Sequence, residues 1–174
     1  MPVSSHQNIP SNEDRLQRLH DLVPGFRGYS ERHARRTSDA LQRQTLATRL
    51  ADLKASLEEL ALTLANNQRI DILAEIDRIR KRIEEQIGEI RFASDRYQAF
   101  FRAQTIDRET LDAVYAFDIG LHRRLDSLKR AVQTLTMEMA ELPKVRCRCR
   151  KVAMRFERLE NELHHRAEAL QNIS

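Results

Sequence analysis

The sequence predicts an all-α fold: an antiparallel three-helix coiled-coil bundle with a short N-terminal helix and a long, kinked C-terminal helical arm. Three segments repeat apolar residues at alternating steps of four and three, which aligns them on one face of a helix. The 174 residues include only 4 Gly and 4 Pro, and 32% are charged, as is typical of long water-exposed helices. The repeats are Leu46, Leu50, Leu53, Leu57, Leu60 and Leu64; then Ile72, Ile76, Ile79, Ile83 and Ile90; then Leu111, Val114, Leu121, Leu125, Leu128, Val132, Leu135, Met139 and Leu142.

Residues 1–11 contain two prolines and several small polar residues, and we expect them to form a flexible tail. Ser11 or Asn12 is a suitable N-cap for a short helix, because both side chains can accept a hydrogen bond from the first turn. Pro24 and Gly25 should end this helix. Its predicted apolar face consists of Leu16, Leu19 and Val23.

Two long helices should follow, joined by a tight turn. Ser30 is a plausible N-cap for a helix over about 31–65. The two asparagines at 66–67 suit a turn, since Asn tolerates the left-handed conformation. A second helix is predicted over about 69–93. Together with 12–30, these segments begin a bundle domain that we place at 12–142.

A third long helix should begin after Asp107, which can cap it, and should reach at least Leu142. Pro143 then interrupts the apolar repeat with a step of three where four is due. We expect a kinked, continuous helix, so that 143–174 forms an arm; the alternative is a reversal at Pro143 that returns the chain as a fourth bundle helix. The arm continues the repeat with Val145, Cys149, Val152, Phe156, Leu159 and Leu163.

Eight of the nine aromatic residues should gather at one end of the bundle, because successive antiparallel helices bring their loops and junctions together there. A packed plug that holds the N-terminal loop is favoured over a recognition surface. Asp118 takes a core position in the third repeat and needs a buried partner, for which Arg27, Arg32 and Arg96 are candidates. The predicted structural cluster is Phe26, Arg27, Tyr29, Phe100, Tyr115 and Asp118.

Several classes of protein are disfavoured by what the sequence lacks. There is no apolar run of the ~20 residues needed to cross a bilayer, and no secretory signal layout, so a cytoplasmic location is expected. Cys147 and Cys149 point away from each other on a helix, which disfavours a shared metal or a disulfide. A single Glu-x-x-His, at Glu162 and His165, falls short of a di-iron set. We therefore predict a non-enzyme with no cofactor, no metal and no catalytic residues.

The apolar stripe of the arm is the first candidate interaction surface. If the arm projects from the bundle, its stripe has no partner within the chain and should bind a second copy or a partner helix. The net charge of +4 is modest, but a dense basic patch flanks this stripe. Such a patch could serve nucleic acid, an anionic lipid surface or an acidic partner. It consists of Lys144, Arg146, Arg148, Arg150 and Lys151.

Two segments resemble an uncharacterised family of small bacterial helical proteins, with a Pro-Gly-aromatic-Arg-Gly-Tyr loop and a Tyr/Phe-rich junction, that are often encoded beside SPFH-domain membrane-scaffold proteins. The loop match spans residues 24–29, and the second match is carried by Phe100, Leu111, Tyr115, Phe117 and Asp118. The resemblance covers about 22–140 and implies no particular activity. It makes an adaptor role in a membrane-scaffold system plausible.

These observations favour a non-catalytic interaction or scaffold module that acts through helix–helix contacts, with self-association as a homodimer through the arm. The alternative is nucleic-acid binding through the basic helix at 144–158. The identity of the partner is not specified by the sequence.

Overall fold

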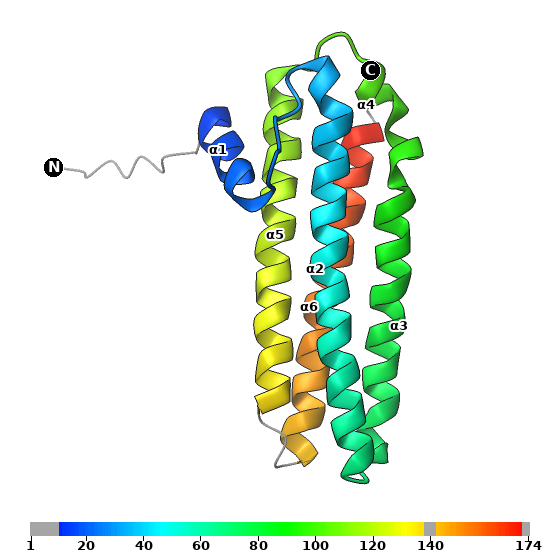
Figure 1. The fold of residues 1–174 in the computed structure, drawn as a ribbon. Coiled ribbons are helices and arrows are strands. Elements are labelled where there is room, and N and C mark those ends of the chain that lie inside the picture. Colours follow the sequence, from blue (N-terminus) through cyan, green and yellow to red (C-terminus); the bar gives the residue numbers. More distant parts are fainter. Residues whose placement is uncertain (1–10, 138–141, 172–174) are drawn as a thin grey trace, which may run out of the picture.

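Four long helices form an up-down-up-down bundle in the computed structural model, which describes residues 11–137 and 142–171 apart from the side chains of Ser94, Leu142 and Pro143. They are α2 (Arg32–Asn66), α3 (Ile70–Phe92), α5 (Arg108–Met137) and α6 (Leu142–Gln171). Figure 1 shows successive helices running in opposite directions, with α2 beside α3 and α5 beside α6. The all-α prediction is confirmed.

The shorter elements lie at or near the end where α2 and α5 begin (Figure 1). Helix α1 (Asn12–Leu22) packs on α5, and the junction after α3 consists of a 3-10 helix, η1 (Ala93–Tyr97), and α4 (Gln98–Arg102). The predicted caps at the starts of α1 and α5 are present. Ser11 forms a reciprocal capping box with Asp14, and the Asp107 carboxylate accepts from the Thr110 backbone N–H at 2.8 Å.

Two predicted details of α2 were wrong. The N-cap position is Glu31, which makes no side-chain capping bond, rather than Ser30. In the turn after α2 the left-handed residue is Gln68, with φ of 58°, and Asn67 has φ of −90°. The turn therefore closes one residue later than the asparagine pattern indicated. The predicted tail before Ser11 and the repeat position Met139 lie outside the described residues.

The main correction concerns α6, which runs antiparallel to α5 and packs against α3 and α5 as a fourth helix of the bundle (Figure 1). The predicted projecting arm at 143–174, and with it the three-helix count, was therefore wrong. Pro143 lies in the first turn of α6, where a missing N–H costs nothing. The step of three at Pro143 marks the start of a new helix rather than a kink.

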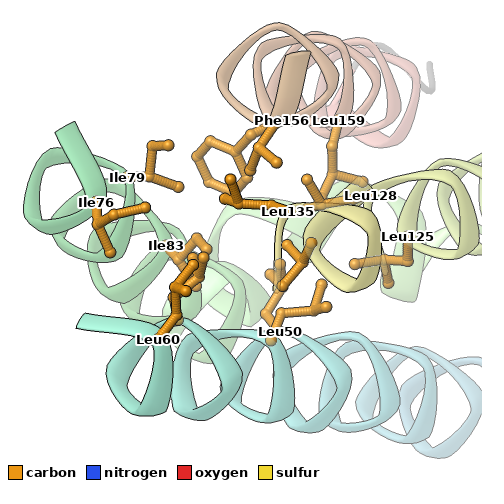
Figure 2. Packing of buried hydrophobic residues seen from close by; sticks show 14 of the residues in the cluster. Leu50, Leu60, Ile76, Ile79, Ile83, Leu125, Leu128, Leu135, Phe156 and Leu159 are labelled. Atoms are coloured by element: carbon orange, nitrogen blue, oxygen red, sulfur yellow. The ribbon is translucent and has the colours of Figure 1, made fainter. Parts of the chain in front are cut away.

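The core explains this arrangement. Val145, Cys149, Val152, Phe156 and Leu159 are each at most 2% exposed and share one cluster with the apolar faces of α2, α3 and α5. Burial of apolar surface contributes roughly 25 cal/mol per Å², so a stripe of this length is strongly stabilised by returning to the bundle. Figure 2 shows the meeting point, with side chains from all four helices: Leu50, Leu60, Ile76, Ile79, Ile83, Leu125, Leu128, Leu135, Phe156 and Leu159.

Candidate functional site

The aromatic cluster at the α1 end is a packed structural core. Tyr29 stacks on Tyr115 with ring centroids 5.5 Å apart, and its edge contacts include Phe26 at 5.1 Å and Phe100 at 5.3 Å. All four side chains are at most 2% exposed. Phe92, in contrast, is 80% exposed and lies outside the cluster. The rings leave no open recognition surface, so the cluster holds the N-terminal loop against α5.

Asp118 has a buried partner, but the partner is Arg166 of α6 rather than Arg27, Arg32 or Arg96. The Arg166 Nε donates to Asp118 Oδ1 at 2.5 Å, and the Tyr29 hydroxyl donates to Oδ2 at 2.6 Å. Burial raises the pKa of Asp118 above its ordinary value, and the charge of Arg166 opposes that rise. Each of the candidate arginines is exposed.

The ionic network extends to α2 and is fully paired. Arg166 also donates to Asp39 Oδ1 at 3.0 Å, while Arg43 donates to Asp39 Oδ2 at 2.8 Å. Arg35, which is fully buried, donates to backbone carbonyls in two separate loops, at 2.7 Å to Tyr29 before α2 and at 2.6 Å to Ala103 after α4. Both carboxylates of the network, Asp39 and Asp118, form ion pairs with arginine. The network joins the helices and offers no free acid or base.

Sequence reasoning missed Arg166, Asp39 and Arg35, although a signal existed. Arg166 follows Leu163 by three residues in the α6 repeat. Asp39 lies seven residues before Leu46, and Arg35 lies four before Asp39, so both continue the α2 repeat toward its N-terminus. Charged residues at core positions of two different helices are candidates to pair with each other. Arg27, a predicted member of the cluster, contributes only its backbone N–H, which donates to Ser38 Oγ at 3.1 Å.

The two cysteines are both free thiols. Cys149 is 2% exposed, and burial raises its pKa to about 11, so it is protonated at neutral pH. Cys147 is exposed on the opposite side of the helix. Leu163, the last predicted interaction residue, is half-buried against the same core as Cys149. The predicted interaction stripe is therefore an internal face of the bundle.

A basic groove between α5 and α6 is the strongest candidate for a functional surface. Two hollows, of about 440 and 280 Å³, adjoin one another and share Ser127 and Arg155. Their lining includes the small residues Ala116, Gly120 and Ala131, and the Glu162 side chain lies against Gly120. Their remaining lining is dominated by seven cationic side chains: Arg123, Arg124 and Arg130 from α5, and Arg148, Lys151, Arg155 and Arg158 from α6.

The groove lies in a region of unbalanced charge. The segments 119–137 and 142–156, which run side by side, carry ten Arg and Lys and one acid, Asp126. That acid forms an ion pair with Arg49 of α2 and so does not neutralise the groove. Within the groove, Glu162 pairs with Arg124 at 2.8 Å.

Four groove cations remain available for a ligand. Arg123, Arg130, Lys151 and Arg158 are exposed, and none bonds to a side chain within the described parts of the chain. Arg155 donates to Ser127 Oγ at 2.6 Å, which holds its guanidinium over the groove without neutralising it.

The predicted basic patch is divided by the helix geometry. Arg148 and Lys151 line the groove, whereas Arg146 faces α3 and lies 3.7 Å from Asp71. Lys144 and Arg150 are exposed and line neither hollow. The sequence therefore identified one of the two helices that line this groove. The α5 arginines that complete the surface were missed because they are brought alongside only when α6 folds back.

A second groove, of about 390 Å³, lies between α2 and α5, along residues 49–63 and 125–136. Its apolar side chains are Leu53, Leu60, Leu125 and Val132, all at most 5% exposed, and its rim carries both signs of charge. The rim, with Arg49, Asp52, Glu59 and Lys129, selects no class of charged partner.

Comparisons with known proteins identify no relative: no family model matches the chain, and no curated protein or solved structure is significantly similar to it. No helix in the described part of the chain has the length and apolar character to cross a bilayer. Among residues 11–137 and 142–171, no group of three or more His, Cys, Asp and Glu side chains is placed to hold a metal ion.

Proposed function

We propose that this protein is a non-catalytic interaction module that binds an anionic partner along the basic groove between α5 and α6. The observation that carries the proposal is the pairing of two cationic rows, one from each helix, beside a continuous hollow. Arg and Lys side chains at this density attract polyanions and speed their association. The buried carboxylates and thiol of the molecule are paired or protonated, which supports a binding role rather than a chemical one.

The proposal replaces the predicted self-association through the apolar stripe. An adaptor role in a membrane-scaffold system remains a prediction of the family resemblance, and a basic binding face is compatible with it.

The test compares two triple variants with equal change of charge. Arg123→Glu, Arg130→Glu and Arg158→Glu reverse the groove, while Arg18→Glu, Arg78→Glu and Arg91→Glu reverse exposed arginines on α1 and α3. We expect wild type to bind immobilised heparin, the control triple to elute at a slightly lower salt concentration, and the groove triple to elute much earlier. Equal shifts for the two triples would mean that binding follows net charge alone, and the proposal would be wrong.

A further inference from the structure

The groove matches a duplex nucleic acid in charge spacing. The cationic α5 side chains of the groove run from Arg123 to Arg130 and those of α6 from Arg148 to Arg158, which at 1.5 Å per residue span about 10 and 15 Å. Over 15 Å one strand of a duplex presents about four phosphates. Seven cationic side chains line the groove, six of them Arg, whose fork of donors suits phosphate oxygens.

The lining also argues against other polyanions. Protein partners are usually held by large aromatic or aliphatic anchors in fitted pockets, and apart from its charged side chains, Glu162 included, the groove lining offers only Ala, Gly, Ser and Thr. Single strands are usually held by stacking of bases on aromatic side chains, and no aromatic residue lines the groove. A lipid surface is entered by large apolar side chains beside the basic ones, and the lining has none.

We propose that the partner is a nucleic-acid duplex, bound through the phosphates of its backbone and without preference for base sequence. The inference rests on the proposed function, because it assigns a ligand class to the same groove. Between the two rows the lining is small at Ser127, Ala131 and Thr134, which leaves room for phosphates there, while Glu162 lies against Gly120 at the other end of the groove. Contacts to phosphate fix the position of a protein on a duplex but carry no sequence information.

The experiment measures fluorescence anisotropy of the full chain with labelled 20-base-pair DNA duplexes of three unrelated sequences, with one of their single strands, with a 20-residue poly-glutamate peptide and with phosphatidylserine vesicles. We expect the duplexes to bind tightest and equally. With about four phosphates neutralised, log K should fall with log salt at a slope of about −3.6. The groove triple should lose at least tenfold in affinity and about 3 units of slope, while the control triple stays close to wild type.

The outcomes separate the two proposals. If poly-glutamate, the vesicles or the single strand binds as tightly as the duplexes, and the groove triple abolishes that binding, the duplex inference is wrong and the proposed function stands. A difference of more than tenfold among the three duplex sequences would also overturn the inference. If no polyanion binds, or both triples behave alike, the proposed function itself fails. Circular dichroism checks that each triple remains helical, as expected for exposed arginines that bond to no other described side chain.

Discussion

His122 is a titratable residue held neutral in the core. Its ring is 1% exposed and lies between Arg49, which is 2.8 Å from Nδ1, and Gln42, whose Oε1 is 3.0 Å from Nε2. Since Arg49 can only donate, Nδ1 accepts and Nε2 carries the proton. Burial, followed by the positive charge of Arg49, lowers the pKa of His122 to about 4.

This shift predicts a loss of stability in mild acid. In the unfolded chain His122 has a pKa of about 6.5, so between pH 6.5 and 4 the unfolded state binds more protons than the folded state. The stability that the folded state gains from neutral His122 is therefore full above pH 6.5 and is lost as the pH falls toward 4. From pH 7 to pH 5 we expect wild type to lose about 2 kcal/mol more than His122→Gln. Urea unfolding at both pH values measures the difference. Parallel losses in the two proteins would show that His122 does not titrate as described.

The N-terminal loop is the element whose path depends most on a single glycine. Gly28 has φ of 84°, and a Cβ there would lie 2.8 Å from the Tyr115 hydroxyl and 2.9 Å from Leu16. The same hydroxyl accepts from the Tyr29 backbone N–H at 2.9 Å, so a displaced Tyr115 would release the loop. The loop ties α1 to the bundle through this contact.

Gly28→Ala should therefore be destabilising, by at least about 2 kcal/mol, because left-handed backbone strain and a steric clash act together. Gly88→Ala is the matched control: Gly88 lies within α3 with nothing within 4 Å of its Cβ position. That change should stabilise the protein by up to about 1 kcal/mol through helix propensity. Thermal unfolding of both variants tests the pair, and equal melting temperatures would contradict the description of the loop.

At the scale of the whole molecule, α6 closes the bundle. Phe156 is fully buried, with the Arg82 guanidinium of α3 5.3 Å from its ring centroid, whereas Met154 on the same helix is 48% exposed. Phe156→Ala should cost about 3–5 kcal/mol in unfolding free energy, because it removes a large core side chain. Met154→Ala should change stability by less than about 0.5 kcal/mol.

Sedimentation distinguishes this role from an external interface. Because Phe156 is a core residue, Phe156→Ala should lower the stability of each chain. It should leave unchanged the molecular mass that sedimentation measures for the folded protein. If Phe156→Ala kept its stability and instead shifted a dimer toward monomer, the α6 face would be an intermolecular surface and its place in the core would be wrong.

The all-α class, the boundaries of α1, α2 and α3 within a few residues, the start of α5 and the core faces of α2, α3 and α5 were determined by the sequence itself. Those features follow from local rules, since a repeat of fours and threes fixes which residues share a face, and Ser11 and Asp107 cap their own helices. The place of α6 was not fixed by such rules. The apolar stripe of α6 could pack equally well against helices of the same chain or against another chain. Only the three-dimensional arrangement of α3 and α5, which leaves their apolar faces open to a fourth helix, decides between them.

The partners of individual polar residues were likewise decided by the tertiary structure. Asp118 was identifiable as a buried acid because it interrupts an apolar repeat, but Arg166 is 48 residues away and meets it only after α6 returns. The basic groove has the same origin, since it forms only where the cationic side chains of α5 and of α6 lie side by side. Ion pairing and charge density depend on distance in space, which sequence spacing along one helix cannot supply.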